Sequence, residues 1–170
     1  ARLALRAVAR AYTGAGPQTI LSEMLVAYCG AESVIGMLES FVRGHAPRPG
    51  AAFCPRVFEA AAAGDAVASE IIRYVGHEQG LNAAAIIRRL GLQALTVPIV
   101  LAGGVFRAES AELVAAIMEP VRAVAPHAHP RLLHAPPVVG GVLLAMEATG
   151  VMPSPEVQAR LAAEARERLG

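Results

Sequence analysis

Apolar residues in the first half of the chain recur every three or four positions, which is the period of amphipathic α-helices. This pattern predicts five helices, at residues 1–12, 20–28, 33–42, 53–63 and 66–90. Glycine or proline punctuates most of the breaks, and Gly64-Asp65 divides the last two helices. Ser33 and Asp65 stand where a side chain can cap a following helix. Residues 1–94 are therefore predicted to be helical.

The period changes after Leu95. Residues 97–102 form a continuous apolar run that ends in Gly103-Gly104, as expected for a strand buried on both faces. A helix at 109–124, a weaker strand at 131–134, an apolar helix at 138–149 and a charged helix at 153–169 follow. The order strand, helix, strand, helix over 95–150 predicts parallel strands, with 151–170 forming a terminal surface helix. The predicted class is α/β and helix-rich.

The predicted strands are too few for an independent sheet. Two strands are marginal alone, and a strand as apolar as 97–102 normally lies in the middle of a sheet. Hydrophobic residues make up 55% of the chain, yet no apolar run approaches the ~18 residues of a membrane helix. We therefore expect strands from a missing N-terminal half to cover this edge, or self-association of the chain through it.

Charge and metal-binding residues exclude several other classes of protein. The formal net charge is +1 and the fifteen basic residues are scattered, so no nucleic-acid partner is expected, and no membrane partner either. Cys29 and Cys54 do not form a CxxC pair and are expected to be buried thiols. His127, His129 and His134 have no carboxylate or cysteine nearby in sequence. No metal site is predicted from them.

No residue pattern identifies a catalytic group. The sequence has no GxxxxGK[ST] loop, and His77-Glu78 lacks the second histidine of HExxH because position 81 is Leu. Gly103-Gly104 fits either a ligand-binding turn or a tight turn that simply requires glycine. For Gly140-Gly141, close packing of a helix on a sheet is favoured over an anion site.

Four segments together resemble the N-acetylglucosamine kinase and BadF/BadG/BcrA/BcrD ATPase family. They are ALRAVARAYTGAGPQTILSEMLVAYCG, FCPRVFEAAAAGDAVASEIIRYVGHEQ, VPIVLAGGVF and LHAPPVVGGVLLAME, in the family's order. The resemblance implies a partial ribonuclease H-like domain of the actin-like ATPases, with its first three strands missing. Residues 1–170 would then be a single C-terminal kinase-like domain.

The resemblance also implies where a cofactor binds. One wall of an adenosine pocket would be formed by Ala51, Ala52 and Phe53, and the opposite wall by Gly103, Gly104 and Val105. The implied cofactor is ATP with Mg²⁺, the substrate of the complete protein is a sugar, and the implied location is cytoplasmic. The family's phosphate loops and its aspartate general base have no counterpart in this sequence, so the chain has no catalytic residue of its own.

The leading interpretation is thus the adenosine-binding half of an ATP-dependent sugar kinase that resembles N-acetylglucosamine kinase. One alternative is a BadF-type ATPase that activates a dehydratase through an iron–sulfur cluster, although Cys29 and Cys54 lack a suitable arrangement for cluster ligation. A second is a non-catalytic ligand-sensing domain of the same fold. A third is a helical scaffold, in which Gly103-Gly104 is only a turn.

Overall fold

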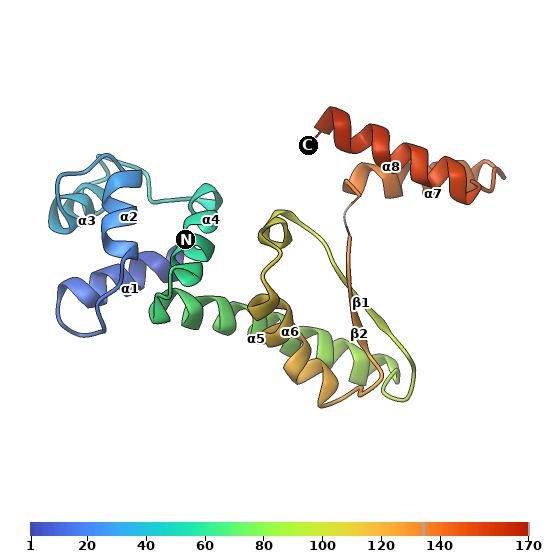
Figure 1. Ribbon diagram of the computed structural model, residues 1–170, viewed down its shortest axis with the longest axis horizontal. Coiled ribbons are helices and arrows are strands. Elements are labelled where there is room, and N and C mark those ends of the chain that lie inside the picture. Colours follow the sequence, from blue (N-terminus) through green and yellow to red (C-terminus); the bar gives the residue numbers. More distant parts are fainter. Residues whose placement is uncertain (134, 170) are drawn as a thin grey trace. The chain divides into compact units, whose positions relative to one another are not determined.

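The computed structural model describes residues 1–133 and 135–169, and helices dominate it (Figure 1). Its elements are α1 (Arg2–Tyr12), α2 (Leu21–Tyr28), α3 (Val34–Val42), η1 (Ala51–Phe53), α4 (Cys54–Ala62), α5 (Ala66–Leu90), β1 (Pro98–Leu101), η2 (Gly104–Ala108), α6 (Ala111–Arg122), β2 (His129–Leu132), α7 (Pro137–Ala148) and α8 (Pro155–Leu169). These elements form two compact units. The first contains Ala1–Ile99 and Gly104–Pro130, and the second contains Val100–Gly103 and the chain from Arg131 onward.

The predicted helices are all present, with small shifts at their ends. A 3-10 turn, η1, precedes α4, so the regular helix begins at Cys54. The start of α6 moves to Ala111 because Glu109 has a positive φ of 45° and Ser110 caps the helix through the N–H of Leu113. By contrast, α7 begins at Pro137, since proline is favoured in the first turn of a helix.

The two strands pair in parallel. The N–H of His129 donates to the carbonyl of Val97, and the N–H of Leu133 donates to the carbonyl of Leu101, so both strands advance in the same direction. The second strand lies at His129–Leu132, two residues before its predicted position, and the predicted end at His134 falls outside the described residues.

The expectation that β1 is buried on both faces is wrong for this chain. Leu101 is buried and Ile99 is half-buried, but Val100 is 55% exposed. In the described residues β1 pairs only with β2. Side chains alternate between the two faces of a strand, so one face of β1 is covered and the other is open.

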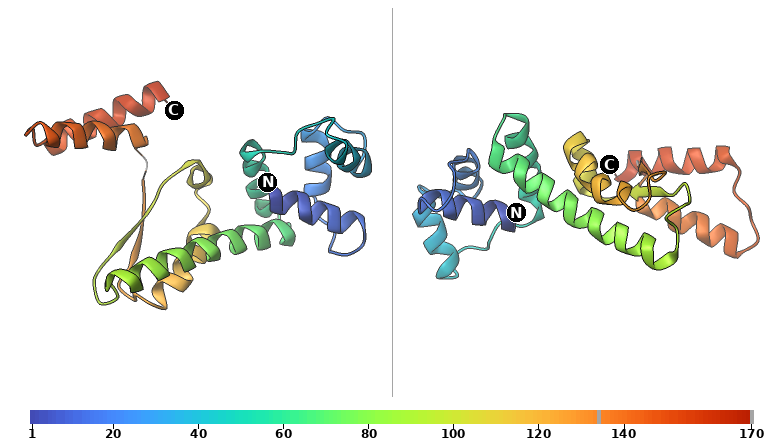
Figure 2. Two further views of the ribbon diagram at one scale, coloured as in Figure 1. Left: turned by 180° about the vertical axis from the view of Figure 1, so that it is seen from behind. Right: turned by 90° about the horizontal axis from the view of Figure 1, so that it is seen from below.

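The core of the first unit lies where α6 packs along α5 (Figure 2). Gly76 and Gly80 lie on α5 four residues apart and face α6. A Cβ atom on Gly76 would lie 2.7 Å from the Cβ of Ala116 and 2.9 Å from the carbonyl of Leu113, while one on Gly80 would collide with the carbonyl of Ile117. The two helices can therefore approach this closely only because these positions lack side chains.

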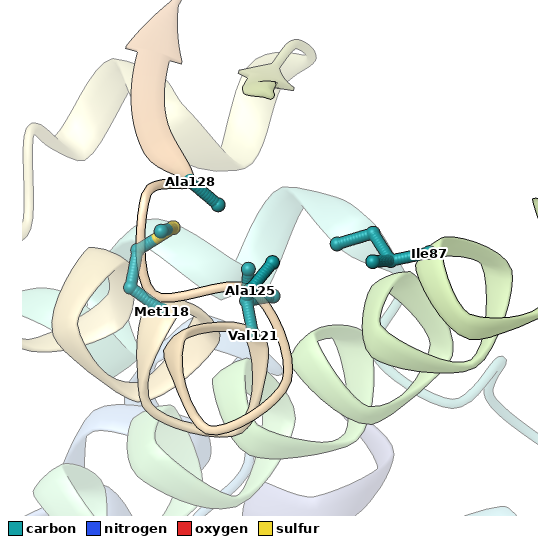
Figure 3. Packing of buried hydrophobic residues seen from close by; sticks show 5 residues of the cluster. All are labelled: Ile87, Met118, Val121, Ala125 and Ala128. Carbon is teal, nitrogen blue, oxygen red and sulfur yellow. The ribbon is translucent and has the colours of Figure 1, made fainter. Parts of the chain in front are cut away.

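A hydrophobic cluster closes the far end of this helix pair (Figure 3). It is formed by Ile87 of α5 with Met118, Val121, Ala125 and Ala128 from α6 and the segment after it. Ile99 of β1 packs against the same cluster, so these contacts fix the start of β1 on the helix pair.

A single carboxylate joins the beginnings of α2 and α5. Asp65 caps α5 by accepting from the N–H of Ala68 at 2.8 Å. It also accepts from the hydroxyl of Thr19 at 2.9 Å and from the N–H of Ile20 at 2.8 Å. The predicted cap is confirmed, and the same side chain links two segments more than forty residues apart in sequence.

In the second unit α7 packs against α8 and leaves much of its apolar surface open. Val138 is 51% exposed and Leu144 is 67% exposed. A Cβ atom on Gly140 or Gly141 would meet nothing within 4 Å. Within the described residues no neighbouring atoms pack closely against these two glycines, so the close-packing explanation stays a prediction.

None of the helices in the described part of the chain is long and apolar enough to cross a membrane.

Candidate functional site

A pocket of about 470 Å³ opens in the first unit, where several of its helices begin. Its walls are the first residues of α1, the turn at Pro49, Gly50 and Ala51, one face of α4, one face of α5, and Val105 of η2. The volume lies within the ~300–1,000 Å³ that small-molecule sites commonly occupy.

The pocket is lined almost entirely by hydrocarbon. The apolar lining includes Phe58 of α4, Ile71 and Val75 of α5, and Val105. Arg2 and Cys54 are the polar side chains among its lining residues. Such a surface suits a flat, largely apolar group, held by close contact and exclusion of water.

The structure brings two of the predicted site residues together from the opposite walls. Ala51 and Val105 are 54 positions apart in sequence and line the same pocket. Gly104 opens η2 beside Val105, and a Cβ atom there would meet nothing within 4 Å, so bare backbone faces open space. Gly103 has a φ of +117°, a conformation that favours glycine over any other residue.

The other four predicted residues, Ala52, Phe53, Gly103 and Gly104, do not line the pocket. Phe53 is completely buried, and its ring packs edge-on against Tyr28 with a centroid separation of 5.1 Å. Ala52 is exposed to solvent and lies outside the pocket's walls. In this structure Phe53 anchors the turn that presents Ala51, because its buried ring fixes η1 against α2.

Sequence reasoning missed most of the pocket's apolar walls. Phe58 follows Cys54 by four residues, and Val75 follows Ile71 by four residues, so each pair lies on one face of its helix. Ile71 and Val75 lie on the apolar face that the helical period of residues 66–90 indicates. The period gives no sign that this part of the face borders a cavity rather than a filled core.

Charged and polar side chains line a second groove, along α5 and α6. Arg73 lies 3.6 Å from Glu112, and His77 lies 4.0 Å from Glu119, with the His77 side chain 47% exposed. His77 therefore lies on a polar face that is open to solvent. Within residues 1–133 and 135–169, no group of three or more His, Cys, Asp or Glu side chains is placed to hold a metal ion.

The two cysteines differ in their surroundings. Both are free thiols and half-buried rather than fully buried as expected. Cys29 ends α2, where burial raises the pKa of its thiol. Cys54 begins α4 and lines the pocket. One thiol therefore reports on the pocket and the other does not.

A helix-rich α/β chain with two parallel strands fits part of an actin-like ATPase domain. The sequence model of the BadF/BadG/BcrA/BcrD ATPase family matches residues 1–145, and the chain belongs to this family. The match spans both predicted walls of the site, at 51–53 and 103–105. A comparison with curated proteins gave no match. The resemblance inferred from the four sequence segments is thus confirmed at the level of the family, which associates the chain with ATP.

Proposed function

We propose that this chain is the adenosine-binding half of an ATP-dependent sugar kinase that resembles N-acetylglucosamine kinase. The observation that supports the proposal most strongly is the apolar pocket whose lining includes both Ala51 and Val105. The proposal assigns the adenosine to the turns at 51–53 and 103–105, with Phe53 acting through its support of the first turn.

The pocket's chemistry agrees with a purine ring. A purine is flat and rigid, so it loses little conformational freedom on binding and gains contact on both faces. Small residues at Gly50 and Ala51 allow the ring to approach the backbone closely, while Phe58 and Val75 provide apolar surface.

In this proposal the groups that transfer phosphate belong to the N-terminal half of the protein, which we call the complementary half. Phosphoryl transfer depends on a metal ion, on backbone or cationic groups around the phosphates, and on a base that orients the acceptor hydroxyl. The sequence of this chain contains no phosphate-loop motif of the GxxxxGK[ST] kind. The chain then contributes nucleotide affinity, while Mg²⁺ binding, sugar selection and catalysis reside in the rest of a cytoplasmic protein.

The complete protein is expected to phosphorylate N-acetylglucosamine in an ATP-dependent reaction, whereas this chain alone is expected to show no phosphorylation above background. Transfer of radiolabelled γ-phosphate to the sugar measures both. ATP hydrolysis without any sugar product, together with bound iron after anaerobic purification, would instead favour a dehydratase-activating ATPase. Nucleotide binding with neither reaction would favour a ligand-sensing domain.

We also propose that the open edge of β1 receives further strands from the N-terminal half of the same protein. The carbonyls of Val97 and Leu101 face β2, so the alternation of backbone groups directs the N–H and C=O of Val100 toward the other edge. The half-exposed Val100 side chain and the open apolar surface of α7 are the other features that such strands would cover.

The isolated chain is accordingly expected to self-associate or to form a complex with its complementary half. Analytical ultracentrifugation across a hundredfold range of concentration measures this directly. A species that remains monomeric and highly soluble at the top of that range would contradict the proposed edge contact.

A further inference from the structure

The turn at Pro49, Gly50 and Ala51 forms one wall of the pocket, and a buried ring anchors it. That ring belongs to Phe53, whose side chain is completely buried. The N–H of Phe53 donates to the carbonyl of Gly50 at 3.2 Å, so the ring and the wall are parts of the same short turn. A shift of the Phe53 ring would therefore displace the backbone that lines the pocket.

Tyr28, the last residue of α2, is the aromatic partner of this ring. The two ring centroids lie 5.1 Å apart and the ring planes meet at 71°, which is an edge-to-face contact. Contacts of this geometry contribute more than the area they bury, because the positive edge of one ring meets the negative face of the other. The Tyr28 residue is 45% exposed and lies outside the pocket's lining, so we place it as a support of the wall rather than as part of it.

The helix that carries Tyr28 is held at its other end as well. Just before α2 begins, Asp65 accepts from the hydroxyl of Thr19 at 2.9 Å and from the N–H of Ile20 at 2.8 Å. The first residue of the helix, Leu21, is completely buried. Tyr28 is thus presented by an anchored helix, and its aromatic contact joins that helix to the pocket wall.

We infer that Tyr28 is a positioning residue for the nucleotide: its ring holds Phe53, and with it the turn at 49–51, in the conformation that binds the base. This inference rests on the proposed function, since it concerns the nucleotide that the same pocket holds. A wall that is ordered before binding loses less conformational freedom when the ligand arrives. Without the Tyr28 ring, part of this ordering has to occur on binding, and the affinity for the nucleotide falls.

Replacing Tyr28 with alanine in the complete protein is expected to raise the dissociation constant for ATP about three- to tenfold, which corresponds to the loss of one aromatic contact. Tyr28→Phe retains the ring and is expected to bind ATP as tightly as the native protein. Tyr12→Ala is the matched control, because Tyr12 also ends a helix, is 51% exposed and lies outside the pocket's lining. It is expected to leave the dissociation constant unchanged. Isothermal titration calorimetry with ATP measures all four proteins.

A merely structural role for Tyr28 has a different result. The melting temperature of Tyr28→Ala would then fall while its affinity for ATP stays at the native value, and this outcome overturns the inference. An equal loss of affinity in Tyr12→Ala overturns it too. If Tyr28→Ala does not fold, Tyr28→Leu, which keeps apolar bulk without an aromatic edge, decides by the same criterion. Failure of the proposed function is recognised separately, because then the native protein itself binds no ATP.

Discussion

Replacing Gly80 with alanine is expected to lower the free energy of unfolding by about 2 kcal/mol or more. The added methyl group collides with the carbonyl of Ile117 and with the ring of Pro120, neither of which can turn aside as a flexible side chain would. Overpacking of this kind lowers the free energy of unfolding by roughly 3 kcal/mol, and the better helix propensity of alanine offsets only about 1 kcal/mol of that loss. Urea denaturation followed by circular dichroism measures the difference.

Gly140→Ala is the matched control for Gly80→Ala. Gly140 also lies within a helix, but a Cβ atom there meets nothing within 4 Å. Without a collision only helix propensity remains, so this variant is expected to be neutral or up to about 1 kcal/mol more stable. Equal destabilisation by both variants would contradict the close approach of α5 and α6.

Replacing Asp65 with alanine is expected to destabilise the chain by roughly 2–3 kcal/mol. The substitution removes the cap of α5, worth about 1 kcal/mol, and leaves the buried hydroxyl of Thr19 without its acceptor. Ser110→Ala is the control, because its hydroxyl caps α6 through the N–H of Leu113 and so acts within one helix. An Asp65→Ala effect no larger than that of Ser110→Ala would show that the link to α2 contributes nothing.

The contribution of Asp65 should also depend on pH. Burial acts to raise the pKa of this carboxyl, but hydrogen bonds from Ala68, Ile20, Thr19 and Val67 outweigh it and hold the pKa below its ordinary value. A lowered folded-state pKa favours folding above the unfolded pKa of about 3.9. The stability difference between the native chain and Asp65→Asn should therefore be complete above about pH 5 and shrink as the pH falls below 3.9. A difference that is constant from pH 7 to pH 2.5 would contradict this.

Sequence reasoning predicted the helices well because their signals are local. The apolar period and the capping residues lie within each helix, so α5 begins after Asp65 and ends at Leu90 as the pattern indicated. The same local evidence predicted two strands and their parallel pairing, which two backbone hydrogen bonds confirm. The position of β2 along the sequence was predicted two residues too late, because Pro130 lies inside the strand and its sequence carries a weak β signal.

Contacts between distant segments were not predictable in this way. The need for glycine at position 80 is set by Ile117 and Pro120, nearly forty residues away. Likewise, the spacing of Ile71 and Val75 marks one helix face, but only packing reveals that this face borders a pocket. Ala51 and Val105 were predicted as opposite walls from the family resemblance, since nothing in their local sequence indicates that they meet.

The most direct test of the central claim is the rate at which each cysteine reacts with iodoacetamide in the presence and absence of ATP. Cys54 lines the pocket and Cys29 does not, so the protein carries its own control. In the complete protein, ATP at ten times its dissociation constant leaves about one site in eleven free, and should slow alkylation of Cys54 by about tenfold without changing that of Cys29. Mass spectrometry of the two peptides gives both rates. Unchanged alkylation of Cys54 while ATP is bound would contradict the assignment of this pocket to the nucleotide.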